Sequence, residues 1–236
     1  MTRRKRNILI VAILILALAI GGWLIYRAKF KDYVDAARML EAVYTAEKSD
    51  ISYTVSLNGN ELDVKFRTVK FPYGDGGSAM KIDVEGEMIS RTFYKINGRS
   101  YEDENSLERM IPKNFMSLLQ WGADIYKSDL EIVRTRDGDR TVYTVKVPDD
   151  MVQSFMDRYL EGLDRLDLTY TGCTLYLTAV DGEMTELTLQ GNARFKRLLG
   201  GEGSAMIMVR AQINAVGDAV SIPTIPQDVQ EQLNHS

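Results

Sequence analysis

The side chains that most often carry acid–base and nucleophilic chemistry are scarce in this chain. Its only histidine, His235, is the penultimate residue, and its only cysteine, Cys173, lies in an alternating apolar stretch. A catalytic triad or a histidine-containing zinc site requires such side chains to be held together by folded structure. We therefore predict no catalytic residue and no metal site, and we interpret Cys173 as a small buried apolar residue.

Carboxylates are numerous, and a glycosidase needs only two of them held several ångströms apart. Those at 137–139 and 181 suit turns, and those at 149–150 suit the start of a helix. The glycine-rich stretches 74–78 and 200–204 precede alternating segments and lack the ending of a phosphate-binding loop. We predict no cofactor and no enzymatic activity. The remaining enzymatic alternative is a hydrolase whose catalytic carboxylates are not distinguished by the residues around them.

One segment combines basic and apolar residues where a hairpin tip is expected. Lys196, Arg197, Leu198 and Leu199 directly precede a glycine-rich stretch. Apolar side chains flanked by cations suit a membrane interface, so these four residues are candidates for contact with a membrane or a partner. The alternative is the end of a strand whose leucines cover the core.

A membrane anchor is the strongest feature of the sequence. Residues 8–26 are 19 consecutive uncharged and mostly aliphatic residues. At 1.5 Å per helical residue they match the roughly 30 Å hydrocarbon core of a bilayer. Trp23 and Tyr26 lie at the end of this run, where aromatic side chains favour the membrane interface. We therefore predict one transmembrane helix over residues 8–26, which places the chain in a cell membrane.

The charges around this run predict its orientation. Residues 3–6 are all basic, which favours a cytoplasmic position for residues 1–7 and an extracytoplasmic position for the rest of the chain. A cleaved signal peptide is the alternative, because residues 17–19 read Ala-Leu-Ala after a short apolar stretch. The apolar run continues beyond them, and this length favours a retained signal-anchor.

The charge balance after the anchor bears on possible partners. Five of the 29 Lys and Arg residues precede residue 28, which leaves 24 basic against 33 acidic residues. A net charge of −9 argues against nucleic-acid binding and against broad adhesion to anionic lipid. We therefore predict that the chain contacts the lipid bilayer through its N-terminal helix and that nucleic acid is not a partner.

Hydrophobic periodicity predicts one mixed domain over residues 30–226. Helical spacing occurs over residues 30–48, 107–119 and 149–163, and Pro112 is expected to interrupt the second of these segments. Between the helices, apolar and polar residues alternate as in strands. Turn-forming pairs separate the alternating segments: Asn58-Gly59, Glu85-Gly86, Asn97-Gly98, Asp137-Gly138 and Asp181-Gly182.

The alternation changes phase within one of these strands. Phe66 belongs to one phase, whereas Val69 and Phe71 belong to the other. Because side chains alternate strictly along a strand, this shift predicts a bulge near Thr68 or a change of the buried face. With antiparallel strands and inserted helices, the predicted fold class is α+β, followed by a polar and mobile tail over residues 227–236.

This order of elements resembles the LolA and LppX/LprG-type lipoprotein-carrier superfamily. The resemblance covers roughly residues 33–226 and includes ARMLEAVYTAEKSDISYTVSL, in which a helix leads into the first alternating strand. It implies a curved antiparallel sheet forming half a barrel, with packed helices on its concave side, in an extracytoplasmic domain whose apolar concavity holds acyl chains. It carries over no functional residue, and the predicted span limits such a domain to lipid near its own membrane.

These features predict a membrane-anchored, extracytoplasmic and non-catalytic binding domain. The resemblance favours a lipid or another hydrophobic ligand. The alternative is an envelope sensor or scaffold domain that recruits another membrane protein through its sheet or its span. An empty apolar groove beside the sheet would favour the first function over the second.

Overall fold

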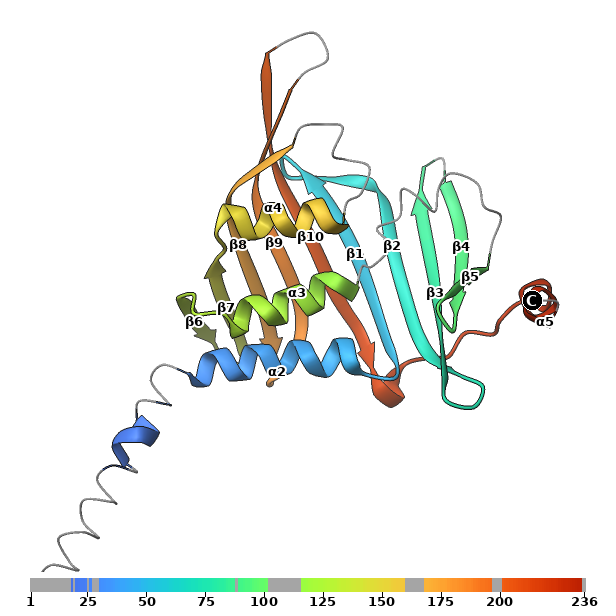
Figure 1. Ribbon diagram of the computed structural model, residues 1–236, viewed down its shortest axis with the longest axis horizontal. Coiled ribbons are helices and arrows are strands. Elements are labelled where there is room, and N and C mark those ends of the chain that lie inside the picture. Colours follow the sequence, from blue (N-terminus) through green and yellow to red (C-terminus); the bar gives the residue numbers. More distant parts are fainter. Residues whose placement is uncertain are drawn as a thin grey trace, which may run out of the picture.

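Three helices lie across one face of an antiparallel sheet (Figure 1). This computed structural model describes residues 18, 20–24, 26, 30–87, 89–101, 116–159, 168–196 and 201–234. Within them the sheet has ten strands in the order β5-β4-β3-β2-β1-β10-β9-β8-β7-β6. The predicted α+β class, with an antiparallel sheet and packed helices, is confirmed.

The first and last strands meet in the middle of the sheet, because β1 pairs with both β2 and β10. The edges of the described sheet are therefore β5 and β6. The strands are β1 (Ser49–Leu57), β2 (Asn60–Tyr73), β3 (Gly77–Gly86), β4 (Ile89–Ile96), β5 (Arg99–Tyr101), β6 (Ile132–Asp137), β7 (Arg140–Lys146), β8 (Thr169–Val180), β9 (Glu183–Lys196) and β10 (Glu202–Val216).

Two-residue turns lie at three of the predicted pairs, namely Asn58-Gly59, Asn97-Gly98 and Asp181-Gly182, and the turn predicted at Asp137-Gly138 is shifted by one residue, because Asp137 still pairs with Arg140. Asn58 and Gly59 join β1 to β2 with positive φ angles of 51° and 82°. This left-handed geometry matches the twist of the paired strands, and Asn and Gly adopt it at the lowest cost. The turn predicted at Glu85-Gly86 is wrong, because β3 continues through both residues and Gly86 pairs with Ile89.

The helices follow from apolar residues at helical spacing. In α2 (Lys31–Thr45) the buried side chains are Ala36, Ala37, Leu40 and Val43, which form one stripe. The helix predicted over 107–119 is described from Met116 onward, as α3 (Met116–Lys127). Residues 102–115, including Pro112, lie outside the described residues. The helix predicted over 149–163 is described as α4 (Asp149–Tyr159).

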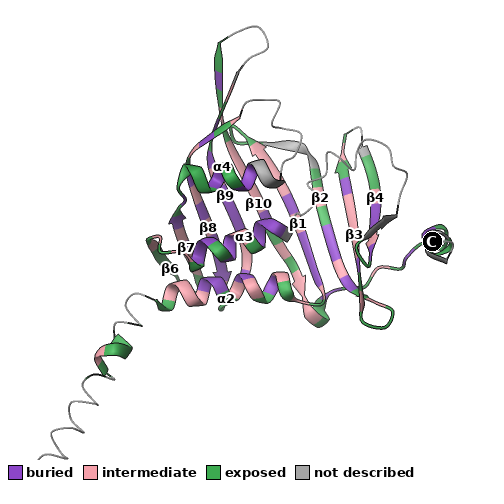
Figure 2. Cartoon of the chain, viewed as in Figure 1, coloured by how far each residue is buried: buried purple, intermediate pink, exposed green. Residues whose placement is uncertain are grey.

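The main core lies between these helices and the sheet. We call the covered side of the sheet the helix face and the opposite side the outer face. The buried residues of the helix face alternate along β1 and β7–β10, and purple bands run along these strands in Figure 2. Their largest fully buried members are Tyr53, Ile51, Leu175, Leu177, Leu187 and Val145, with Tyr126, Leu40 and Leu119 from the helices.

The phase shift in β2 is a change of buried face, and a bulge does not cause it. The pairing of β2 with β3 runs without a shift from Lys65 to Tyr73. Phe66 therefore faces the helices, whereas Val69 and Phe71 point to the outer face. There they pack with residues from the C-terminal part of the chain. The two faces of β2 thus serve two separate apolar clusters.

The C-terminal segment is more ordered than its polar sequence predicts. Residues Gln227–Asn234 form helix α5, and Val229 is only 7% exposed. The predicted mobile tail is therefore corrected over these residues, because Val229 is buried on the outer face of the sheet together with Val220 and Ile225. The segment from Gln227 has few apolar side chains, so no helical spacing of apolar residues can be detected in its sequence, and the sequence pattern does not reveal this contact.

The predicted span lies mostly outside the described residues, which include only residues 18, 20–24 and 26 of it. Trp23 and Tyr26 are described, with exposed fractions of 55% and 46%. Within the described part of the chain, no helix has the length and apolar character needed to cross a membrane. The transmembrane helix thus stays a prediction.

Candidate ligand-binding face

A second apolar surface occupies the helix face of β2, β3 and β4. We call it the wing surface, and it consists of Phe66, Met80, Ile82, Val84 and Phe93. The strand register places these side chains in adjoining rows. Phe66 pairs with Val84, and Ile82 pairs with Phe93. Because directly paired residues project from the same face, the five side chains form one continuous apolar patch.

The described helices end before they reach this surface. In Figure 1, α2, α3 and α4 cross β7–β10 and end near β1, while β2, β3 and β4 continue beyond their ends. Phe66 packs against the edge of the main core. Val84 is 2% exposed and Phe93 is 9% exposed, whereas Met80 and Ile82 are half-buried. Val84 and Phe93 are therefore already covered, and the wing surface is an apolar wall that extends the core beyond the ends of the described helices.

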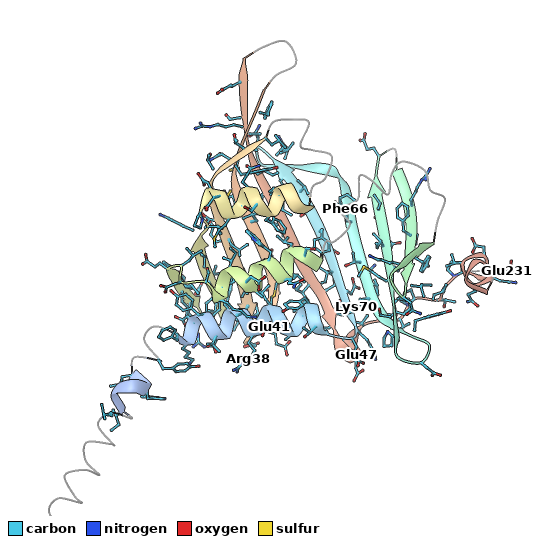
Figure 3. The ribbon with its side chains drawn as sticks, viewed as in Figure 1. Arg38, Glu41, Glu47, Phe66, Lys70 and Glu231 are labelled. Carbon is cyan, nitrogen blue, oxygen red and sulfur yellow. The ribbon has the colours of Figure 1, made fainter. Side chains whose placement is uncertain are left out.

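Three basic side chains project from the same face at the ends of these rows. Lys70 and Lys95 flank Met80 across the strands, and Arg91 pairs with Val84. Lys70 donates hydrogen bonds to two carbonyl oxygens at the end of α2, at 2.8 Å from Ala46 and 3.5 Å from Tyr44. Its charge thus stabilises the C-terminal end of α2. Figure 3 shows Lys70 and Phe66 along β2.

The outer face of the same strands carries a network of charged groups. Asp50 in β1 accepts hydrogen bonds from Arg67 in β2 and from Asn214 in β10, at 2.6–2.9 Å. Burial acts to raise the pKa of Asp50, but the hydrogen bonds from Arg67 and Asn214 and the charge of Arg67 together lower it. Asn214 lies at the irregularity of the β1–β10 pairing, which turns its amide toward Asp50.

The network continues across β3 and β4. Asp83 accepts a hydrogen bond from Lys81 at 2.8 Å and one from Thr92 at 2.6 Å. Asp83 also lies opposite Arg67 in the register. Charges of alternating sign therefore run along the outer face from β1 to β3. Each charge of this network has a partner of the opposite sign or a hydrogen-bond donor, so the removal of one partner would be costly, and we do not interpret the network as a binding site.

The C-terminal segment covers the apolar part of the outer face. Val220, Ile225 and Val229 are each 6–7% exposed. They pack on a set of outer-face residues from β2, β3 and β4, namely Val69, Phe71, Ala79, Tyr94 and Ile96. The outer face of this part of the sheet is thus occupied by the chain itself, and among the described residues we take the wing surface as the candidate site for an apolar ligand.

Two buried titratable groups of the described residues, Cys173 and Tyr126, have pKa values shifted by burial. Burial, with a smaller effect of Asp149, raises the pKa of the Cys173 thiol to about 11. The thiol is therefore protonated at neutral pH and is a weak nucleophile. Burial also raises the pKa of Tyr126, whose hydroxyl donates a 2.7 Å hydrogen bond to the carbonyl oxygen of Tyr143. Among the residues that the structure describes, no group of three or more metal-binding side chains occurs.

The hairpin tip proposed as a membrane or partner contact is only partly described. Lys196 ends β9, and Arg197, Leu198 and Leu199 lie outside the described residues. Strands β9 and β10 form the two arms of this hairpin, and their last backbone pair before the tip is Lys196 with Glu202. Figure 1 shows this hairpin extending beyond the neighbouring strands. The tip therefore stays a prediction, separate from the wing surface.

A shallow pocket of about 580 Å³ lies beside α5. It is formed by Thr224, Ile225, Pro226, Gln227, Gln230 and Glu231, so most of its lining is polar. We do not interpret it as the ligand site, because it is open and consists of one short segment.

No protein-family model matches the sequence, and no curated protein is similar to it in sequence. Among solved structures, MucB in complex with MucA(peri) is 13% identical, with a TM-score of 0.34 over 82% of this chain. The Pseudomonas aeruginosa MucA/MucB complex is 14% identical, with a TM-score of 0.36 over 83% of this chain. This chain covers only 62% and 60% of those two chains.

A putative outer membrane lipoprotein-sorting protein domain from Vibrio parahaemolyticus is 8% identical. Its TM-score is 0.27, over 86% of this chain and 96% of that chain. These similarities are too low to support an argument about function. The function is therefore inferred from the residues of this chain.

The sequence pattern predicts the strands that carry the wing surface, but it does not predict that their apolar side chains form one patch. Ile82 and Val84 were visible as an alternating pair, and Phe66 as part of the preceding strand. The pattern shows that one face of each strand is apolar, but it does not show which residues become neighbours. The phase shift after Phe66 was the one available signal that both faces of β2 are buried.

Proposed function

We propose that this protein is a non-catalytic binding domain that holds a lipid-like ligand against the wing surface. The observation that carries the proposal is the apolar patch on the helix face of β2, β3 and β4, beyond the ends of the described helices. Apolar side chains in a sheltered surface bind acyl chains by removing hydrocarbon from water, at roughly 25 cal/mol per Å². The predicted resemblance to LolA and LppX/LprG-type carriers agrees with this function.

The basic residues beside the patch favour an anionic amphiphile. Arg91 and Lys95 project from the helix face at opposite ends of the apolar rows. A carboxylate or phosphate headgroup near either of them would be attracted electrostatically, while its acyl chain lies on Ile82 and Phe93. This chemistry is shared by fatty acids and phospholipids, and the experiment below distinguishes between them.

Native mass spectrometry of the full chain, released from detergent micelles, tests the ligand. We expect copurified lipid and, after delipidation, saturable binding of palmitate or of phosphatidylglycerol as separate probes. Ile82→Glu places a charge in the patch and is expected to weaken binding of the better probe about tenfold or more. Ser90→Glu is the matched control, because Ser90 is exposed on the neighbouring strand β4.

The proposal fails if neither probe binds and no lipid copurifies. It also fails if Ile82→Glu binds as well as Ser90→Glu does. Circular dichroism of both variants shows whether the sheet has formed. Because Ile82→Glu can disturb folding, Ile82→Ala provides a second test, in which loss of contact area is expected to weaken binding while the fold is retained.

We further propose that residues 8–26 hold this domain at the outer surface of a cell membrane. The support is the length and apolar character of that run, the basic residues before it and the aromatic residues at its end. Since α2 begins at Lys31, the domain would lie within a few residues of the bilayer. Protease added to intact cells should digest the C-terminal domain, and protection that ends only on lysis would contradict the orientation.

A further inference from the structure

Strand β6 is an edge of the sheet with no neighbour on its outer side among the described residues. It pairs with β7 on one side only, and every residue from Val133 to Asp137 is exposed. Figure 2 shows this edge in green, in contrast to the purple strands beside it. The other described edge, β5, has only three residues. An exposed strand edge presents unpaired backbone N–H and C=O groups, to which another strand can add.

The hairpin geometry identifies the groups that point outward. The turn between β6 and β7 contains two residues, so Asp137 and Arg140 close the hairpin as a pair. In such a hairpin the pairs that exchange backbone hydrogen bonds alternate with pairs that do not. Asp137, Thr135 and Val133 therefore bond to β7. Consequently, the N–H and C=O groups of Ile132, Arg134 and Arg136 point away from the sheet.

Two arginine side chains line the helix face of this edge. The guanidinium of Arg134 lies 3.1 Å from Asp32 of α2 and 5.7 Å from the centre of the Tyr143 ring. Arg136 donates a 3.1 Å hydrogen bond to the carbonyl oxygen of Gly138. Within the described residues, Arg136 has no ion pair. Arg134 is thus partly neutralised, and Arg136 is the cation available to an added strand.

The outer face of the edge has a different character. Val133 is 54% exposed there, followed by Thr135 and Asp137. Glu131 precedes the strand and is also exposed. The negative charges therefore lie at the two ends of β6, and the middle of its outer face is neutral. An added strand would meet positive charge on one side and a valine and a threonine on the other.

This charge pattern disfavours the antiparallel pairing of two copies of β6 that is centred on Thr135. If two copies of β6 pair antiparallel about Thr135, Arg134 of each lies opposite Arg136 of the other. Like charges directly opposite each other destabilise a strand pair. Carboxylates at alternate positions of an added strand would instead face both arginines, as favourable cross-strand pairs.

We propose that β6 is a docking edge for an extended segment of another protein that carries acidic side chains at alternate positions. Main-chain hydrogen bonds to Ile132, Arg134 and Arg136 would supply affinity, and the contact of a carboxylate with Arg136 would supply selectivity. The site lies at the opposite edge of the sheet from the wing surface, so it does not depend on the proposed lipid ligand.

The test uses the full chain in detergent micelles and a fluorescently labelled eight-residue peptide of alternating glutamate and threonine. Fluorescence anisotropy should show saturable binding. A peptide of alternating lysine and threonine is expected to bind at least about tenfold more weakly, because like charges then face Arg136. N-methylation of the glutamates should abolish binding in the antiparallel arrangement, because it removes the N–H groups that would reach the edge.

Three substitutions separate backbone pairing from charge. Arg136→Pro removes one outward N–H and the charge, at a position where the ladder to β7 is unaffected. It should abolish peptide binding. Arg136→Glu should weaken binding about tenfold or more, and Arg136→Lys should stay within about twofold of the parent. Circular dichroism and urea unfolding confirm that each variant is folded.

The proposal is overturned if the glutamate and lysine peptides bind equally. It is also overturned if Arg136→Pro binds the glutamate peptide as the parent does, or if the N-methylated peptide still binds. Because the two peptide controls require no variant, the test remains decisive if Arg136→Pro does not fold. A dimer of the parent chain that is lost in Arg136→Pro, without any peptide binding, would identify the edge as a contact between copies and would equally reject the proposal.

Discussion

Asp50 and Arg67 form a two-point ion pair between the first two strands. Arg67 Nε lies 2.9 Å from Asp50 Oδ1, and Arg67 Nη2 lies 2.6 Å from Asp50 Oδ2. The amide of Asn214, in the last strand, donates a further 2.9 Å hydrogen bond to the same carboxylate. One carboxylate therefore connects β2, β1 and β10. It lies where the first strand of the chain, β1, pairs with the last, β10.

We expect Asp50→Asn to destabilise the domain by about 2 kcal/mol, because charged hydrogen bonds contribute roughly 1.5–3 kcal/mol each and Arg67 is half-exposed and can be hydrated in the variant. Urea unfolding followed by circular dichroism measures the difference. Asp218→Asn is the control, since Asp218 pairs with Lys48 but is fully exposed. Its unfolding midpoint should not change, and a shift as large as that of Asp50→Asn would contradict the assignment.

The contribution of Asp50 should depend on pH in a defined direction. The pKa of Asp50 is lower in the folded protein than the ordinary value of about 3.9 for an unfolded chain. The stabilisation is therefore complete above about pH 5 and is lost as the pH falls through the folded pKa. Urea unfolding of the parent and of Asp50→Asn from pH 7 to pH 3 should give curves that converge at low pH. A constant difference would contradict the prediction.

Cys173 should be unreactive in the folded protein. With its pKa raised to about 11, its thiolate fraction at pH 8 is about 100-fold lower than for a thiol of pKa 9. The side chain is also only 3% exposed. Reaction with Ellman's reagent should be slow at pH 8 and fast after unfolding in guanidinium chloride. Equal rates in the two states would show that the thiol is accessible and that the local packing is different.

Gly191 should not tolerate a side chain. A Cβ atom at this position would collide with Cys173 Sγ and lie 3.2 Å from Cys173 Cα. We expect Gly191→Ala to destabilise the domain by about 2 kcal/mol, as overpacked core variants do. In a double-variant cycle with Cys173→Ala, part of this loss should be recovered, because the sulfur atom is absent. Additive effects of the two changes would exclude this contact as the cause.

The C-terminal segment should shield an apolar surface. Val229→Ser removes a buried apolar side chain from the outer-face cluster, and we expect a loss of about 1 kcal/mol and stronger fluorescence of the dye ANS. Ile222→Ser is the matched control in the same segment, because Ile222 is 52% exposed. Both measurements should leave this control unchanged. Equal effects of the two variants would show that Val229 does not cover the sheet.

Much of the local structure was predictable from the sequence. The alternation from Ile51 to Leu57 and the pair Asn58-Gly59 predicted a strand and a tight turn, and both are present. The apolar stripe of α2 was equally clear. These predictions succeed because the period of the side chains follows directly from backbone geometry, and a few residues suffice to detect it.

The neighbours of each element were decided only by the tertiary structure. The sequence offered two interpretations of the phase shift between Phe66 and Val69, and only the covering of both faces of β2 distinguishes them. The sequence does not predict the short polar helix α5, because its position depends on the packing of Val229 against strands that are far away in the sequence. The wing surface and the free edge β6 likewise depend on the order of the strands in the sheet.

The sequence by itself therefore determined where most strands, three of the tight turns and the helices α2, α3 and α4 occur, and it predicts the membrane anchor. Only the tertiary structure decided which faces are covered, which edge is open and which charges meet, such as those of Asp50 and Arg67. The physical reason is that periodicity records that a side chain is buried, whereas the group that buries it comes from a part of the chain far away in sequence.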